Sequence, residues 1–153
     1  MQKLNFPEYD FRITKNEDGK TYIFDTLRKK ELLLTPEEWV RQHVLHYLMS
    51  EKAFPASLIS TEAGVKVNRL SRRYDALIYT RKGEAYMLVE CKAPSVRINQ
   101  EVFDQIIAYN RSIKAPYLLI TNGLKHFCCQ FDRISHQYVF LPEIPPFESP
   151  EIR

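Results

Sequence analysis

Glycine is scarce in this chain of 153 residues, which has only four, at positions 19, 64, 83 and 123. A phosphate-cradling P-loop and the dinucleotide-binding turn of a Rossmann fold both need clustered glycines. These four lie too far apart for either motif. An ATP-driven motor and a Rossmann oxidoreductase are therefore excluded, and no nucleotide cofactor is expected.

Long apolar runs and paired cysteines are lacking as well. No stretch approaches the roughly 18 apolar residues of a membrane span, and residues 1–10 do not resemble a signal peptide. The three cysteines are Cys91, Cys128 and Cys129, and the two neighbours would form only a strained bridge. The four histidines lack the spacing of a zinc finger. We therefore expect a cytoplasmic protein with reduced thiols, no zinc and no membrane contact.

Hydrophobic residues make up 44% of the chain and charged residues 27%, which is typical of a single globular domain. The net charge of +3 is small but uneven: residues 61–100 hold eight Lys or Arg against four Asp or Glu. This basic segment could contact phosphate groups. An alternative interpretation is that these side chains only aid solubility.

Turn and capping signals divide the chain into predicted elements. Thr35, Pro36 and Glu38 have the pattern of a capping box, so a helix should begin there and continue to about Lys52. Asn99 should cap a second helix. We predict a β-hairpin of Tyr9–Thr14 and Thr21–Asp25, a second hairpin of Tyr74–Thr80 and Glu84–Cys91, a helix over 100–113, and strands over 117–121, 126–131 and 137–141. The expected organisation is a hairpin extension (1–34), a core (35–141) and a proline-rich tail (142–153).

The second predicted hairpin brings two acidic residues together. With a two-residue loop at 82–83, or a four-residue loop at 81–84, the numbers of facing residues sum to 165, so Tyr79 faces Tyr86 and Asp75 faces Glu90. Facing carboxylates on one sheet surface repel each other unless something neutralises them. A divalent cation would do so.

Strand alternation adds Lys92 to this pair, because Glu90 and Lys92 leave the same face while Cys91 points to the other. Two carboxylates, with the Cys91 carbonyl as a further ligand, suit Mg²⁺ or Mn²⁺. Lys92 could orient or help to deprotonate a metal-bound water. An alternative is that Asp75 and Glu90 form ion pairs with Arg72, Arg73 or Lys92 at the end of the sheet.

Several segments together resemble a known family. They are Glu-Glu-Trp-Val-Arg-Gln at 37–42, Tyr74-Asp75, Val-Glu-Cys-Lys-Ala-Pro at 89–94, Phe-Asp-Gln-Ile at 103–106 with Tyr109, and Leu-Ile-Thr-Asn-Gly at 119–123. This pattern is similar to that of the PD-(D/E)XK nucleases, most closely the N-terminal nuclease domain of type I restriction enzyme R subunits. The similarity runs from about Pro36 to Gln130.

The resemblance implies an α/β fold with a restriction-endonuclease-like core, in which helices flank a mixed β-sheet. It also implies that Asp75 and Glu90 bind the metal and that Lys92 is the catalytic lysine. Gln105 and Tyr109 match the family's Gln-x-x-x-Tyr motif, which acts near DNA and the active site. Their spacing of four places both on one helical face, although a polar tip at a helix edge would have the same spacing.

Family members often add a helical glutamate to the metal site. Glu37 is our choice, because it precedes Val40 and Val44 by three and seven residues and so shares their inward face. An acidic residue favoured in the first turn of a helix is the alternative explanation. We expect the basic surface of Arg69, Arg72 and Arg73 to hold the DNA backbone.

Two features depart from the family. Tyr74 stands where the name-giving proline would be, which leaves the metal chemistry untouched, and the ATP-dependent translocase of the R subunits is missing. The first hypothesis is thus a Mg²⁺-dependent DNA endonuclease. The alternative is a non-catalytic module that binds DNA or docks on a separate motor or specificity subunit. A third interpretation is a small α/β protein with ion pairs at the end of its sheet.

Overall fold

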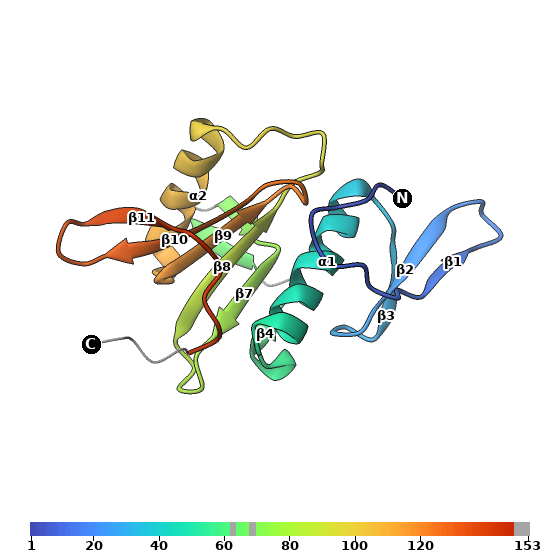
Figure 1. The fold of residues 1–153 in the computed structure, drawn as a ribbon, viewed down its shortest axis with the longest axis horizontal. Helices are drawn as coiled ribbons and strands as arrows, with labels where there is room; N and C mark the ends of the chain where they lie inside the picture. The colour runs from blue at the N-terminus through green and yellow to red at the C-terminus, as the bar shows by residue number, and fades with distance from the viewer. Residues whose placement is uncertain (62–63, 68–69, 149–153) are drawn as a thin grey trace.

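A six-stranded mixed sheet forms the centre of the molecule (Figure 1). The computed structural model describes residues 1–61, 64–67 and 70–148, with the backbone alone for 64–67 and 70–73. The strand order is β11-β10-β9-β8-β7-β4, and only β8 and β9 run parallel. These strands are β4 (Ile59–Ser60), β7 (Ala76–Tyr79), β8 (Ala85–Cys91), β9 (Tyr117–Thr121), β10 (His126–Asp132) and β11 (Gln137–Leu141).

The two faces of this sheet carry separate cores, each covered by one helix. Met87 and Val89 pack with the buried residues of α1 (Pro36–Glu51), whereas Leu88 between them packs with those of α2 (Gln100–Ile113). This division follows from the alternation of side chains along β8. The predicted α/β class, with helices flanking a mixed sheet, is confirmed.

Helix α1 begins where the sequence predicts. Thr35 Oγ1 accepts a hydrogen bond from the Glu38 amide at 3.0 Å, and Pro36 occupies the first turn. The reciprocal half of a capping box is not formed, because the Thr35 amide donates to the Leu33 carbonyl. Val40 and Val44 are fully buried, as their spacing predicts.

The predicted N-terminal hairpin is present but forms part of a three-stranded sheet, made of β1 (Ile13–Lys15), β2 (Thr21–Asp25) and β3 (Lys30–Leu33). The prediction of a first strand from Tyr9 was wrong. The rings of Tyr9 and Phe11 pack on histidines of α1, with ring centroids 4.5 Å from His46 and 4.9 Å from His43. Side-chain packing on the helix thus replaces strand pairing over these residues.

The loop of the core hairpin is neither of the two expected lengths. The Gly83 amide donates to the Thr80 carbonyl at 2.9 Å and the Thr80 amide to the Glu84 carbonyl at 2.7 Å, which closes a three-residue loop. Gly83 takes a φ of 84°, in the left-handed region that glycine favours. Tyr79 therefore pairs with Ala85, and the expected pairing with Tyr86 was wrong.

An irregularity between Ile78 and Tyr79 then corrects the register, so that Ala76 pairs with Val89 and the facing numbers again sum to 165. Asp75, which precedes Ala76, consequently lies beside Glu90 as predicted. A further hairpin of β5 (Gly64–Val67) and β6 (Leu70–Arg73) and a 3-10 turn, η1 (Ala56–Leu58), precede β7. Neither α1 nor α2 has the length and apolar character needed to cross a membrane, and no other helix in the part of the chain described does.

Candidate active site

Asp75, Glu90 and Lys92 meet at one end of the central sheet. Asp75 occupies the bend before β7, Glu90 is next to last in β8, and Lys92 follows that strand. Asp75 is only 7% exposed, and the Glu90 side chain is 17% exposed. The register of the hairpin therefore places two largely buried carboxylates side by side.

Both oxygens of Asp75 have partners. Oδ2 accepts a hydrogen bond from the Cys91 amide at 2.7 Å, and Oδ1 lies 3.2 Å from Arg41 Nη2. Burial raises the pKa of Asp75, while the Cys91 amide and the Arg41 guanidinium act in the opposite direction. The Asp75 carboxylate is thus held in one orientation from the strand on one side and from α1 on the other.

Glu90 is the more perturbed member of the pair. Burial, and after it the charge of Asp75, raises the pKa of Glu90 to about 8. Lys92 Nζ lies 3.8 Å from Glu90 Oε1 and favours the ionised form, but it does not offset these two effects. With a pKa of about 8, this group retains a proton at neutral pH. Because the two carboxyl groups interact, that proton belongs to the pair rather than to Glu90 alone.

The two glutamates at the start of α1 have different surroundings. Glu38 is buried, with Oε1 3.2 Å from Arg41 Nη1 and Oε2 accepting a hydrogen bond from Gln42 at 2.9 Å. Glu37 is exposed, so the expectation that it shares the inward face of Val40 was wrong. Its carboxyl nevertheless lies close enough to Asp75 that this charge, after partial burial, raises the pKa of Glu37.

Arg41 is the residue of this cluster that sequence reasoning missed. One guanidinium contacts Glu38 and Asp75, which are 37 positions apart in the chain, and its Nε is buried without a hydrogen-bond partner in the part of the chain described. The available signals were its place in the family-like segment 37–42 and its position three residues after Glu38, a spacing that many exposed helical pairs share.

The residues present fit a hard divalent cation in their donor chemistry. Mg²⁺ is commonly held by one or two carboxylates and keeps several waters, and Asp75 and Glu90 supply two carboxylates. Among residues 1–61, 64–67 and 70–148, no group of three His, Cys, Asp or Glu is arranged to hold a metal ion. Cys91 is fully buried, with its side chain in the core on the α1 side of the sheet as expected.

The other predicted site residues differ in where they lie. Gln105 is exposed on α2, whereas Tyr109 is buried, with its ring centroid 6.4 Å from that of Tyr74. Both residues lie within α2 four positions apart, and the ring of Tyr109 contacts the residue that directly precedes Asp75. Arg69 lies outside the described residues, and Arg72 and Arg73 belong to β6, whose backbone alone is described.

A groove of about 400 Å³ lies beside Lys92, between residues 94–98 and the turn that joins β9 to β10. The Lys92 amide donates to the Thr121 carbonyl at 2.9 Å and the Asn122 side chain to the Val96 carbonyl at 2.9 Å, so both walls are tied to the end of β9. Arg97 and Lys125 give this groove a basic lining. It therefore offers cationic side chains at the same end of the sheet as the carboxylates.

Comparisons with known proteins agree with this architecture. The family model described as type I restriction enzyme R protein N terminus matches residues 36–145. A search of curated proteins gave no match. A fragment structure described as an HsdR subunit of a type I restriction enzyme from Vibrio vulnificus YJ016 has a similar fold, with a TM-score of 0.54 and 21% identity over 73% of this chain.

The matched region covers 24% of that structure's chain, so the likeness concerns one part of the larger protein and shows the fold alone. The family model, in contrast, covers more than two thirds of the present sequence, from the start of α1 through β11. The chain therefore belongs to the family of type I restriction enzyme R protein N-terminal domains.

Proposed function

We propose that this chain is a Mg²⁺- or Mn²⁺-dependent DNA endonuclease domain that hydrolyses phosphodiester bonds. Membership of a restriction enzyme family supports action on DNA. The observation that carries the proposal is the meeting of Asp75, Glu90 and Lys92 at the end of β8. Two buried carboxylates that share a proton and border a lysine form a pair of the kind found at functional sites.

Each residue of the cluster has a role in this proposal. Asp75 and Glu90 hold the cation, with the Cys91 carbonyl and Glu37 as further oxygen ligands. The cation, when bound, lowers the pKa of a water and shields the charge that develops on phosphorus. Arg41 is a positioning residue, because it holds Oδ1 of Asp75.

Protonation of Glu90 sets a condition on this activity. A protonated carboxyl is a poor ligand for a hard cation, and burial and the charge of Asp75 raise the pKa of Glu90 to about 8. Lys92 Nζ borders the same carboxyl and can orient a water molecule or transfer a proton there. We therefore expect cleavage to be weak below neutral pH and to increase as the pH rises.

The path of DNA is assigned to the basic groove beside Lys92, with Arg97 and Lys125 contacting phosphate groups. Gln105, Tyr109, Arg69, Arg72 and Arg73 remain proposed contributors to catalysis or DNA contact on the basis of the family resemblance. In this proposal residues 35–141 form the nuclease core. Residues 1–34 and 142–153 are an extension and a tail, and a separate motor or specificity subunit directs the domain to its DNA.

A non-catalytic DNA-binding or docking module is the second candidate, and one observation favours it. Both oxygens of Asp75 are already engaged, by the Cys91 amide and by Arg41, and Lys92 pairs with Glu90. Such a closed set of contacts can neutralise the carboxylates without a metal. Nicking activity separates the two candidates.

The test is nicking of supercoiled plasmid with Mg²⁺ or Mn²⁺ by the wild type and by the Glu90→Gln and Lys92→Met variants. We expect each variant to be slower by about 100-fold or more, the usual effect of losing a metal ligand or an acid-base group. Glu84→Gln and Lys82→Met make the same chemical changes at the exposed tip of the same hairpin and serve as matched controls.

Nicking by the control variants should stay within about twofold of the wild type, since their side chains lie at the opposite end of the hairpin from Asp75. Equal nicking by all five proteins would show that the activity does not come from this site. DNA retention without nicking in any of them would favour the non-catalytic module.

A further inference from the structure

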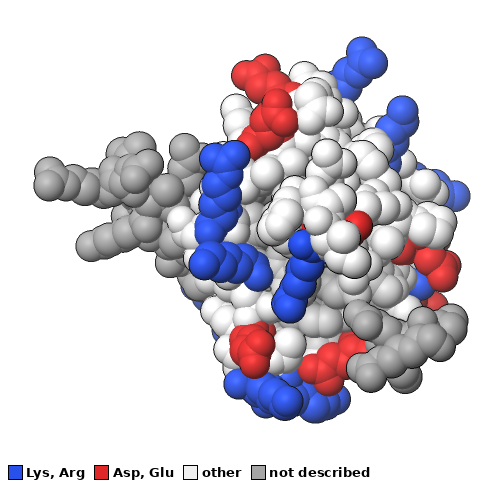
Figure 2. Space-filling view, turned by 90° about the vertical axis from the view of Figure 1, so that its left-hand side faces the viewer, with Lys and Arg blue, Asp and Glu red and all other residues white. Residues whose placement is uncertain are grey.

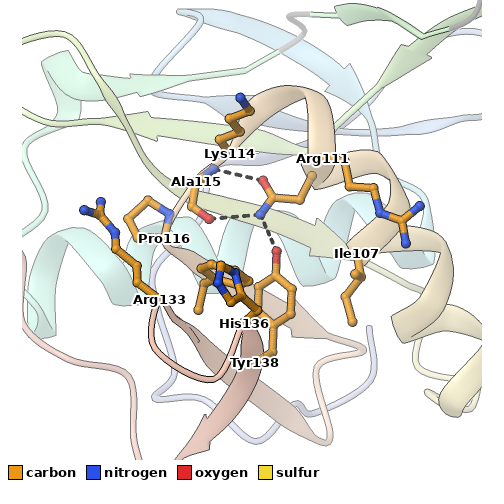
Figure 3. Close-up of a pocket in the computed structure, with 10 residues that line it drawn as sticks. Ile107, Arg111, Lys114, Ala115, Pro116, Arg133, His136 and Tyr138 are labelled. Carbon is orange, nitrogen blue, oxygen red and sulfur yellow. Dashed lines mark hydrogen bonds between the residues drawn. The ribbon is translucent and has the colours of Figure 1, made fainter.

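A second basic hollow lies at the other end of the sheet from the carboxylates. It has a volume of about 540 Å³ and opens between the end of α2 and the β10–β11 hairpin (Figure 3). Its wall includes Pro116, the residue before β9, whereas the active-site residue Cys91 pairs with Thr121, the last residue of β9. Four residues of β9, about 13 Å of strand, therefore separate the hollow from the carboxylate end of the sheet.

Aromatic side chains form the floor of this hollow. The ring centroids of Phe131 and Tyr138 lie 5.3 Å apart, and those of Phe131 and His136 lie 6.2 Å apart. The amide of buried Asn110 donates to the Tyr138 hydroxyl at 2.8 Å and to the Ala115 carbonyl at 2.9 Å, and it accepts from the Ala115 amide at 3.0 Å. The Asn110 amide and the Tyr138 hydroxyl are thus already paired, which holds the floor in place and leaves ring surfaces facing the hollow.

The rim carries three permanent positive charges, those of Arg111, Lys114 and Arg133. All three residues are exposed, and in Figure 3 their side chains stand on the right, top and left of the aromatic floor. None of the ten lining residues is acidic. Figure 2, which looks at this side of the molecule, shows Lys and Arg side chains across its middle, while most Asp and Glu lie toward the margins.

Stabilisation of the helix explains only part of this charge. Arg111 and Lys114 lie at the carboxyl end of α2, where cations interact favourably with the helix dipole. Arg133 comes from the turn between β10 and β11 and has no such role. Within residues 1–61, 64–67 and 70–148, none of the three cations forms an ion pair with an acid. The positive charge of the rim is therefore not neutralised by these residues. Arg133 is the cation whose position the helix dipole does not explain.

We propose that this hollow binds an unpaired nucleotide, with the phosphate on the cationic rim and the base against the rings of Tyr138 and His136. Basic side chains around aromatic surfaces are the usual way in which proteins hold single-stranded nucleic acid, and the volume lies in the range of small-ligand pockets. An inorganic phosphate would use the rim alone. The nucleotide comes either from a single strand or from the free pool, and the proposal does not rest on the nuclease activity.

Binding of a short fluorescein-labelled oligothymidylate, measured by anisotropy in EDTA, tests the proposal without cleavage. We expect Arg133→Ala and Arg111→Ala each to weaken binding by about fivefold to tenfold. Lys20→Ala removes the same charge from an exposed position on the N-terminal sheet and should change binding less than twofold. Competition by thymidine monophosphate would show that the hollow also binds a free nucleotide. If thymidine monophosphate does not compete, the hollow binds only nucleotides within single-stranded nucleic acid.

A second readout is local to the hollow. The NMR signals of the His136 imidazole should shift as the oligothymidylate is added, while those of His46, which packs on Tyr9 and lines neither the hollow nor the groove beside Lys92, should not. Equal weakening by Arg133→Ala and Lys20→Ala, or His136 signals that stay in place at saturation, would overturn the proposal. Failure of the plasmid-nicking test would leave it standing, because neither measurement here requires cleavage.

Discussion

Arg41 Nη2 lies 3.2 Å from Asp75 Oδ1, while Nη1 of the same guanidinium lies 3.2 Å from Glu38 Oε1. A residue of α1 therefore fixes a carboxylate that stands at the end of the central sheet. Arginine suits this bridging position, because its planar guanidinium can donate to two different carboxylates at once. Orientation of the candidate site thus depends on how α1 packs against the sheet.

Replacement of Arg41 by alanine should destabilise the fold by about 3 kcal/mol, because it leaves Glu38 and Asp75 buried without their shared cation. Urea unfolding followed by circular dichroism measures the change. Arg81→Ala is the control, since Arg81 is 68% exposed and its 3.7 Å pair with Glu148 should contribute less than about 1 kcal/mol. Equal losses in the two variants would contradict the structural role of Arg41.

The raised pKa of Glu90 makes the stability of the fold depend on pH. The ordinary pKa of this group is 4.5 and its pKa in the folded state is about 8. The folded state therefore holds a proton that the unfolded state releases, so this group's contribution is greatest below pH 4.5 and falls as the pH rises through 8. Glu90→Gln removes the dependence.

We expect Glu90→Gln to be more stable than the wild type at pH 8.5, by on the order of 3 kcal/mol, with the difference shrinking toward pH 5. Urea unfolding at a series of pH values gives this difference directly. Glu84→Gln, at the exposed tip of the same hairpin, is the matched control. A stability difference that does not change with pH would mean that burial beside Asp75 does not hold Glu90 protonated.

Magnesium should counteract this loss of stability if the two carboxylates form the metal site. Binding to the folded state alone raises the melting temperature, and the cation must first displace the proton of Glu90. Added Mg²⁺ should therefore raise the melting temperature of the wild type more at pH 8.5 than at pH 6.5, beyond the effect of K⁺ at matched ionic strength. An equal effect of Mg²⁺ on Glu90→Gln would place the binding elsewhere.

Local patterns predicted that Asp75 and Glu90 would lie side by side. The alternation along β8 and the pairing of the hairpin placed Asp75 beside Glu90. The predicted loop length was wrong, but the irregularity between Ile78 and Tyr79 offsets the extra shift and restores the predicted pairing. Register in a buried hairpin is set by which faces are apolar as well as by the turn. The apolar run before Glu90 thus carried the needed information.

Features that depend on contacts between distant elements could not be predicted in the same way. The pairing of Arg41 with Asp75 joins residues 34 positions apart, and the rim of the second hollow joins α2 to the β10–β11 turn. Residues 101–153 hold five basic and six acidic residues, so charge counting gave no sign of Arg111 and Arg133 gathering there. Tertiary packing alone concentrates these charges.

The two glutamates of α1 should respond differently to removal of their charge. Glu38→Gln should cost about 2 kcal/mol or more of stability, because buried Glu38 pairs with Arg41 and accepts from Gln42. Glu37→Gln should leave stability within about 0.5 kcal/mol and should reduce the Mg²⁺-induced rise in melting temperature. If only Glu38→Gln reduces that rise while Glu37→Gln leaves it intact, Glu37 is not part of the metal site.

Arg97 should contribute one phosphate contact at the groove beside Lys92. Each phosphate neutralised by a protein cation releases condensed counterions, so the logarithm of duplex affinity falls linearly with the logarithm of salt concentration. Arg97→Ala should therefore weaken binding to duplex DNA of any sequence and make this slope shallower by about 1, measured by anisotropy in EDTA. Lys20→Ala, a loss of the same charge on the N-terminal sheet, should leave the slope unchanged. An unchanged slope in Arg97→Ala would move the DNA away from this groove and separate it from the end of the sheet where Asp75 and Glu90 meet.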